Sequence, residues 1–278
     1  MKDLNGYLER MSKSIVPEKL FFLNKINWNE IKWIADIGNA DGELLLVLYE
    51  KLSKEYPDIV FVGIDNNPLM LEKYLENINT RIGTDNNFYG YKNFTEAIKE
   101  QDLIKDTPGL IIFSSVLHEI PGGSIPLNFS CLEYTGVKYI AIRDMYHEES
   151  VKDPGLNQKQ KEVYNNILDN YNYVKEMIVS KVVNSNHKNN NDELDTVKFF
   201  YQLLLKYTYV DNWETESKED YFSTDWIGNT SYLINRGFST IYDKKYLLQF
   251  KRNEVQKNLK YEMSMSTHRQ MIFIKKEK

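Results

Sequence analysis

Residues 31–42 are Ile-Lys-Trp-Ile-Ala-Asp-Ile-Gly-Asn-Ala-Asp-Gly, an apolar run that ends at an acid and continues into a loop of small residues. Such a run is typical of a buried strand in a parallel sheet. Gly38, Ala40 and Gly42 leave room for a ligand to approach the backbone where larger side chains would collide. A good helix-forming sequence follows over 43–52. The stretch therefore predicts a strand, a ligand-binding loop and a helix, although ligand-free connections in α/β domains can have the same pattern.

A second apolar run, Ile-Val-Phe-Val-Gly-Ile-Asp over 59–65, also ends at an acid, 29 positions after Asp36. A helix is expected next, over 68–77. In a βαβ unit with adjacent parallel strands, Asp36 and Asp65 lie at neighbouring carboxyl ends, where such sheets bind ligands. A carboxylate at that place can accept both hydroxyls of a ribose. The two acids favour a nucleoside-like ligand over the alternative of unrelated acids at two strand ends.

The loop also distinguishes between nucleotide cofactors. Nicotinamide and flavin sites have Gly-x-Gly-x-x-Gly, with the pyrophosphate on the helix N-terminus. In this chain Glu43 stands at the place of the third glycine. Its carboxylate would repel a pyrophosphate, so an NAD-type oxidoreductase is disfavoured and a ligand without phosphate is favoured.

Asp36, Gly38 and Gly42, spaced Asp-x-Gly-x-x-x-Gly, resemble the first motif of the class I S-adenosylmethionine (SAM)-dependent methyltransferases. Val-Gly-Ile-Asp over 62–65 resembles their second motif. Leu-Ile-Ile-Phe-Ser-Ser-Val-Leu-His-Glu over 110–119 resembles their fourth strand and the loop after it. The family usually has glycine where this chain has Ala40, and alanine does not easily take a positive φ, so a different loop shape is expected there.

The resemblance implies an α/β fold with a seven-stranded, mostly parallel Rossmann-like sheet and helices on both faces. Strands are expected over 32–37, 59–64, 86–90, 109–114 and 137–143, alternating with helices over 42–54, 68–77, 93–101 and 123–134. A further helix should begin after the Ser-Thr-Asp of 223–225 and end at Gly237. Two last strands, over 239–250 and 268–275, pair antiparallel at the sheet edge in this family.

The apolar spacing changes after Asp144 and predicts a long helix over 157–183, a polar loop over 184–192 and a second helix over 194–209. This helical hairpin is inserted between strands five and six. Its tyrosines either form ordinary core or line a substrate lid. The expected domains are an N-terminal helical lid (1–30), the methyltransferase domain (31–150 and 223–278) and a helical insertion that caps the substrate (151–222).

The resemblance implies which residues hold SAM. Asp36 would bind the methionine amino group, the 38–42 loop would line the methionine portion, and Asp65 would bind the ribose. Asn66 and Phe94 would flank adenine, with Asn93 near its amino group. The full expected set is Asp36, Gly38, Asn39, Ala40, Gly42, Asp65, Asn66, Asn93, Phe94 and Ser115.

The catalytic candidates follow strands four and five. His118 is the first choice for a general base or for a group that orients the acceptor, because its reference pKa near 6.5 suits proton transfer at neutral pH. The alternative is a histidine that caps the following turn. Glu119 would orient the imidazole or bind the substrate, and Arg143 and Asp144 are either polar groups of the pocket mouth or an ion pair at a strand end.

The loop after strand four also excludes acceptor classes. Amino-directed DNA methyltransferases carry Asp/Asn-Pro-Pro-aromatic where this chain has Ser-Ser-Val-Leu, and cytosine-C5 enzymes need a Pro-Cys nucleophile, whereas Cys131 follows Ser130. Ribose 2′-hydroxyl enzymes of the Lys-Asp-Lys-Glu type have Asp where Ser114 or Ser115 stands. Those three classes are disfavoured.

Composition limits the remaining possibilities. The single cysteine and the absence of Cys/His spacing predict no metal site. No apolar run approaches the roughly 20 residues that span a bilayer, and no signal segment is apparent, so a cytoplasmic protein is expected. The net charge of −5 disfavours indiscriminate nucleic-acid binding. Residues 244–278 carry ten Lys/Arg against three Glu and form either a solvated surface or a patch for an acidic or nucleic-acid partner.

These observations predict a SAM-dependent methyltransferase that acts on an oxygen or nitrogen of an unidentified acceptor, with a small molecule favoured over RNA or protein. The alternative is a binding module of the same fold that retains a nucleoside or a partner without turnover.

Overall fold

The computed structural model describes residues 18–83, 87–148, 154–174, 196–209 and 219–276. By its contacts the chain divides into two units. The sheet unit contains described residues of 5–144, 223–244 and 269–278, and the helical unit contains those of 145–222 and 245–268.

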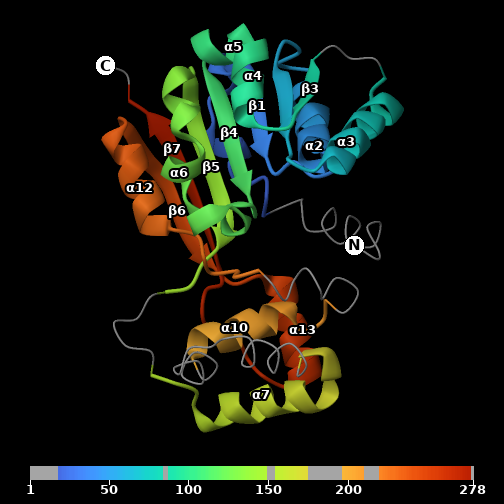
Figure 1. The fold of residues 1–278 in the computed structure, drawn as a ribbon, viewed down its shortest axis with the longest axis vertical. Helices are drawn as coiled ribbons and strands as arrows, with labels where there is room; N and C mark the ends of the chain where they lie inside the picture. The colour runs from blue at the N-terminus through green and yellow to red at the C-terminus, as the bar shows by residue number, and fades with distance from the viewer. Residues whose placement is uncertain (1–17, 84–86, 149–153, 175–195, 210–218, 277–278) are drawn as a thin grey trace. The chain divides into compact units, whose positions relative to one another are not determined.

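The sheet has seven strands in the order β3-β2-β1-β4-β5-β7-β6 (Figure 1). The strands are β1 (Trp33–Ile37), β2 (Val60–Ile64), β3 (Phe88–Tyr91), β4 (Gly109–Ser114), β5 (Val137–Met145), β6 (Phe238–Tyr246) and β7 (His268–Lys275). The pairs β1–β2, β1–β4, β2–β3 and β4–β5 are parallel. β7 runs antiparallel to β6, because Thr267 N bonds Tyr246 O (3.0 Å) at one end and Lys276 N bonds Gly237 O (2.9 Å) at the other. The predicted seven-stranded, mostly parallel sheet is confirmed.

Helices connect these strands. In the sheet unit they are α2 (Glu43–Leu52), α3 (Pro68–Arg81), α4 (Phe94–Glu100), α5 (Asp102–Asp106), α6 (Ile125–Asn128) and α12 (Trp226–Asn235). Short 3₁₀ turns are η1 (Leu23–Lys25), η2 (Trp28–Glu30), η3 (Leu117–Glu119), η4 (Pro121–Gly123) and η5 (Ser130–Tyr134). η1 and η2 fall in the predicted N-terminal lid, of which residues 1–17 lie outside the described residues.

The two faces of the sheet receive different parts of the chain, because successive strand residues point to opposite faces. Ile34, Ile112 and Ala141 share a core with α2, α3 and the segment over 20–31. On the other face the Phe113 ring packs edge-on against Phe129 at 5.0 Å between ring centroids. By the same alternation Arg143 lies on the α2 face, two residues after Ala141, and Asp144 lies on the opposite face.

The helical unit is built from α7 (Gln158–Asn170), α10 (Val197–Lys206) and α13 (Gln249–Leu259). α7 and α10 match the two predicted hairpin helices in part, and residues 175–195, including the predicted polar loop, lie outside the described residues. Its core takes side chains from all three helices, among them Ile167, Leu204 and Val255.

α13 corrects the predicted strand over 239–250, because that strand ends at Tyr246 and a helix begins at Gln249. The buried stripe of α13 is Lys251, Val255 and Leu259, spaced four residues apart. Because the first buried residue of this helix is a lysine, the apolar residues alone do not show a helical spacing. Residues 245–268 therefore group with the helical unit, whereas the sequence analysis placed them in the methyltransferase domain.

Several cations of the basic 244–278 segment have acidic partners. Lys251 lies 2.7 Å from Glu254, and Arg269 binds Asp243 through two hydrogen bonds of 2.9 and 2.7 Å. Contact of this segment with an acidic partner stays a prediction. None of the helices in the described part of the chain is long and apolar enough to cross a membrane.

Candidate active site

The loop between β1 and α2 has a left-handed backbone at three positions, with φ of +73° at Gly38, +49° at Ala40 and +81° at Gly42. Gly38 N and Asn39 N both donate to Ile64 O, at 2.8 and 3.0 Å. Ala40 therefore takes the positive φ that the sequence analysis did not expect of alanine.

The Asp65 carboxylate joins two loops at the carboxyl edge of the sheet. Its Oδ2 accepts a hydrogen bond of 2.9 Å from Ala40 N, and its Oδ1 accepts one of 2.9 Å from Asn67 N. Because Ala40 N is anchored in this way, the strained residue is stabilised by the carboxylate. Each carboxylate oxygen keeps a further lone pair with which a ligand hydroxyl can bond.

The glycines are required by packing as well as by backbone shape. A Cβ on Gly42 would lie 2.0 Å from Tyr74 Cδ2, and one on Gly38 would lie 2.5 Å from Val116 Cγ2. Val116 belongs to the loop that follows β4. The glycine-rich loop and the loop after β4 are therefore in direct contact.

Two buried charged groups face this region without a hydrogen bond or ion pair to any other described residue. Asp36 is 3% exposed, and burial raises its pKa to about 7, with the charge of Lys19 opposing the rise and that of Asp65 adding to it. Lys19 is 8% exposed, and burial lowers its pKa to about 8, as does the charge of Arg143, whereas Asp36, Asp41 and Glu119 raise it. No sequence motif marked Lys19, which lies ahead of the first strand.

The side chain of Asn39 is also buried without a hydrogen bond to any described residue. It is 4% exposed, and neither its Oδ1 nor its Nδ2 has a hydrogen-bond partner among the described residues. Buried amides are normally bonded, so this side chain has a donor and an acceptor with which a ligand or a water molecule can bond.

Glu43 lies at the first position of α2 and forms an ion pair with Arg81. Arg81 also lies 2.7 Å from Glu50 Oε1. Arg81 offsets the negative charge that the sequence analysis invoked against a pyrophosphate. Glu43 therefore repels a pyrophosphate less than an unpaired carboxylate would, although the first turn of the helix still lacks the third glycine of the dinucleotide motif.

The expected adenine contacts do not gather at the loop. Asn93 caps α4 by accepting a 3.0 Å bond from Glu96 N, and Asn66 is exposed. Phe94 is 2% exposed and packs against Trp33, the first residue of β1, at 6.4 Å between ring centroids. Phe94 thus contributes to the core in the described structure, and its contact with adenine stays a prediction.

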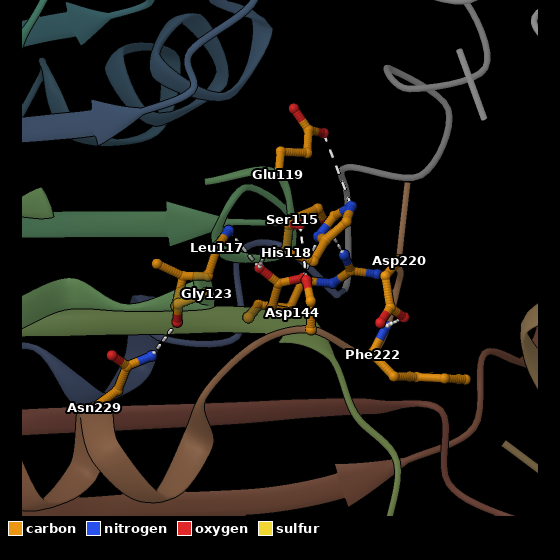
Figure 2. Close-up of polar contacts among 11 residues, drawn as sticks. Ser115, Leu117, His118, Glu119, Gly123, Asp144, Asp220, Phe222 and Asn229 are labelled. Carbon is orange, nitrogen blue, oxygen red and sulfur yellow. Dashed lines mark hydrogen bonds and ion pairs between the residues drawn. The ribbon is translucent and has the colours of Figure 1, made fainter. Parts of the chain in front are cut away.

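His118 and Asp144 form a buried pair at the ends of β4 and β5 (Figure 2). His118 Nδ1 lies 2.6 Å from Asp144 Oδ1, and Asp144 Oδ2 accepts hydrogen bonds from Leu117 N (2.6 Å) and His118 N (3.3 Å). Because a carboxylate only accepts hydrogen bonds, Nδ1 carries the proton and Nε2 keeps its lone pair in the neutral imidazole. This arrangement supplies a fixed proton acceptor.

Glu119 lies at the other ring nitrogen, with its Oε1 3.8 Å from His118 Nε2. Its side chain is about half exposed. The partner that orients the imidazole through Nδ1 is therefore Asp144, and Glu119 lies where a group that approaches Nε2 would meet it.

Arg143 bonds Ser115 Oγ and lies 3.7 Å from Glu18 Oε2. Ser115 has a φ of +59°, and its N donates to Arg143 O at 2.7 Å. Burial raises the pKa of Glu18, whereas the charges of Arg143 and Lys244 lower it. Arg143 and Asp144 lie on opposite faces of β5, so the two predicted candidates have different neighbours.

Two residues beyond the helical insertion complete the loop that carries His118. Ser223 Oγ donates to His118 O at 2.9 Å, and Asn229 bonds both Gly123 and Ile125. Neither residue was singled out in the sequence, where they lie over 100 positions from their partners. Within the described ranges, no group of three or more His, Cys, Asp or Glu side chains could hold a metal ion.

No protein-family model matches the sequence, and a search of curated proteins gives no match. Solved structures do match the fold. The plantazolicin methyltransferase BamL, crystallised with a triazolic desmethylPZN analog and SAH, has a TM-score of 0.51 at 13% identity, over 98% of this chain and 89% of that chain. An O-methyltransferase family protein from Burkholderia thailandensis gives 0.47 at 11% identity, over 98% and 59% of the two chains. The arsenic(III) SAM methyltransferase CrArsM from Chlamydomonas reinhardtii gives 0.46 at 12%, over 96% and 73%.

Proposed function

We propose that this chain, which has the fold of the class I SAM-dependent methyltransferases, transfers a methyl group from SAM to a hydroxyl oxygen of a small molecule. The observation that carries the proposal is the buried pair of His118 and Asp144. It belongs to the loop that packs on the glycine-rich loop through Val116. A donor site and a proton acceptor are thereby adjacent at the carboxyl edge of the sheet, where open α/β sheets bind ligands.

The residues in and around the glycine-rich loop have the chemistry to bind SAM. The Asp36 carboxylate suits its ammonium group, the Lys19 ammonium suits its carboxylate, and Asp65 keeps lone pairs for the ribose hydroxyls. The amide of Asn39 offers a donor and an acceptor that nothing else in the described chain uses. When bound, SAM supplies an electrophilic methyl group on a cationic sulfur.

The acceptor is a hydroxyl because the site contains a positioned base. A neutral amine can attack with its own lone pair, whereas an alcohol or phenol must lose its proton during the transfer. His118 Nε2 takes that proton while the hydroxyl oxygen gains the methyl group, and Asp144 stabilises the resulting imidazolium through Nδ1. The imidazolium then releases the proton to solvent, which restores the base for the next turnover.

The helical unit serves as the substrate cap in this proposal. Its chain runs between β5 and β6 and returns between β6 and β7, so its connections begin one residue after Asp144. The net charge of −5 disfavours nucleic acid as the acceptor. Of the two classes that remain, protein and small molecule, we take a small molecule, and labelling of separated pools distinguishes the two.

Two measurements test the function. Calorimetric titration with S-adenosylhomocysteine (SAH) should give saturable binding that Asp65→Ala weakens. SAM labelled with ¹³C in its methyl group, offered with separated small-molecule, RNA and protein pools, should label the small-molecule pool. The label should resist alkali, which hydrolyses methyl esters, and its ¹³C chemical shift should be that of a methyl group on oxygen and not on nitrogen. Binding without labelling of any pool would indicate a nucleoside-binding module, and absence of SAH binding would exclude both functions.

A further inference from the structure

The loop that carries His118 has little regular structure of its own. Between β4 and α6 it consists of the turns η3 and η4, and Gly122 and Gly123 have φ of +66° and +58°. Its internal backbone bonds are local, such as Glu119 N to Val116 O at 3.0 Å and Gly123 N to Ile120 O at 3.0 Å. Contacts from outside the loop are therefore needed to hold an imidazole at the precision that catalysis requires.

Asn229 of α12 supplies two of those contacts. It is 1% exposed; its Nδ2 donates to Gly123 O at 2.8 Å, and its Oδ1 accepts from Ile125 N at 2.7 Å. Figure 2 shows the side chain pointing from its helix to Gly123. Because one contact needs a donor and the other an acceptor, a carboxylate of the same shape could make only one of them.

The chain just before α12 makes further contacts with the same loop. Ser223 Oγ donates to His118 O at 2.9 Å, and Asp225 N donates to Gly123 O at 3.2 Å. A Cβ on Gly123 would lie 2.2 Å from Ser223 O and 2.5 Å from Thr224 Cα. The two backbones therefore pack against each other directly, and the His118 loop is bonded at both His118 and Gly123.

We infer that Asn229 is a positioning residue for His118. It acts through the main chain, because its amide bonds residues 123 and 125 of the loop, while Ser223, in the segment before α12, bonds the carbonyl of His118 itself. The inference rests on the proposed function for its catalytic meaning. The orientation of the imidazole, however, can be measured without an acceptor.

The test compares three variants by nuclear magnetic resonance of ¹⁵N-labelled histidine. Asn229→Ala removes both contacts, Asn229→Asp keeps the side-chain size but replaces the donor to Gly123 O with an acceptor, and Asn235→Ala, an exposed asparagine on the same helix, is the matched control. The chain has four histidines, so the His118 signals are assigned by their loss in His118→Gln. SAH affinity and the free energy of unfolding are measured in parallel.

We expect both Asn229 variants to bind SAH within about threefold of the wild type and to show an altered His118 signal, with the Nδ1 proton exchanging faster and the ring no longer in one tautomer. Methyl transfer should fall about 10–100-fold, as expected for a misplacement near 1 Å, with a changed pH profile. Asn235→Ala should match the wild type in each measurement. If Asn229→Asp folds and leaves the His118 signal and the pH profile unchanged, the inference is overturned. If the wild type binds SAH without transfer, the proposed function fails, while the His118 signal still decides the role of Asn229.

Discussion

At the scale of single residues, Asp144 determines what His118 can do. Its carboxylate accepts from Leu117 N, His118 N and His118 Nδ1, so it fixes both the loop backbone and the ring. The lone pair on Nε2 is the consequence of that bonding. A histidine at the same place without Asp144 would lose the carboxylate that keeps the proton on Nδ1.

Asp144→Asn tests this dependence. Asparagine has nearly the same shape but presents an N–H to His118 Nδ1 where a carboxylate oxygen accepted. The imidazole therefore takes the tautomer with its proton on Nε2, and Nε2 can no longer act as the base. We expect methyl transfer to the labelled pool to fall by about 10²–10⁴, the range of general-base catalysis, with the SAH dissociation constant unchanged within about threefold. His118→Gln should give a similar loss. A normal transfer rate in either variant would remove the dyad from the mechanism.

Asp36 and Lys19 predict how stability depends on pH. The pKa of Asp36 is about 7 in the folded chain and 3.8 as a model value, so between these values the folded chain binds more protons and the free energy of unfolding falls as pH rises. The pKa of Lys19 is about 8 against 10.5, so between these values the unfolded chain binds more protons and stability rises with pH. Each slope is at most about 1.4 kcal/mol per pH unit for one proton.

Urea unfolding across this pH range measures both slopes. Asp36→Asn should flatten the fall between pH 4 and 7, and Lys19→Met should flatten the rise between pH 8 and 10.5. An Asp36→Asn variant that keeps the wild-type slope below pH 7 would show that this carboxyl is not the group that titrates.

Lys19 also predicts a ligand preference. If its ammonium binds the carboxylate of the cofactor, Lys19→Met should weaken SAH by about 10–100-fold, since a hydrogen bond to a charged group contributes about 1.5–3 kcal/mol. Methylthioadenosine, which lacks the amino-acid portion, should bind both proteins equally. Lys32→Met, at an exposed lysine just before β1, is the control. Equal loss of affinity for both ligands would indicate a general effect on the fold.

At the scale of elements, the glycine-rich loop is shaped by two requirements that can be separated. Gly42 and Gly237 have nearly the same φ, +81° and +84°, but a Cβ on Gly42 meets Tyr74 at 2.0 Å whereas one on Gly237 meets nothing within 4 Å. Gly237→Ala therefore reports the backbone cost alone.

Gly42→Ala adds the clash to that cost. We expect Gly237→Ala to lower the free energy of unfolding by about 1–2 kcal/mol and Gly42→Ala to lower it by about 1–3 kcal/mol more, measured in urea at one pH. SAH affinity should fall only in Gly42→Ala, because Gly237 follows α12. Equal destabilisation of the two variants would show that Tyr74 moves aside freely.

Most strands of the sheet could be predicted from the sequence, whereas one helix could not. The five parallel strands were predicted within a few residues, because strands buried on both faces have continuous apolar runs that need no knowledge of their neighbours. The loop glycines, Asp65 and His118 were singled out for a related reason, since each directly follows a predicted strand. α13 was missed because its buried stripe begins with Lys251, whose partners come from the fold.

Residues that act across the chain could not be found in this way. Asn229 and Ser223 bond groups more than 100 positions earlier, and nothing in their local sequence distinguishes them from a helix start. Lys19 became a candidate only because it interacts with the charge of Asp36, which lies in β1. Phe94 shows a different limit, because the sequence does not distinguish an aromatic residue that packs into the core from one that packs against a ligand.

At the scale of the whole molecule, β1 lies between β2 and β4 in the sheet. Strands β2 and β3 are added on one side of β1, and β4 and β5 on the other, so the strand order reverses at β1. Ligands bind at such a reversal in open α/β sheets. The glycine-rich loop, the end of β2 and the loop after β4 all meet there through Asp65 and Val116. The helical unit has a separate core made from α7, α10 and α13.

This division predicts where the cofactor slows hydrogen exchange. With SAH in excess, backbone amides of residues 38–42, 65–67 and 115–119 should exchange more slowly, because a bound ligand suppresses the local openings that expose them. Amides of α10 and α13 should be slowed only by the global gain in stability, about 2.7 kcal/mol at 100 times the dissociation constant. Asp65→Ala at the same SAH concentration is the control and should show little protection in any peptide. Protection confined to α10 and α13 would place the nucleoside in the helical unit and contradict the site at the sheet edge.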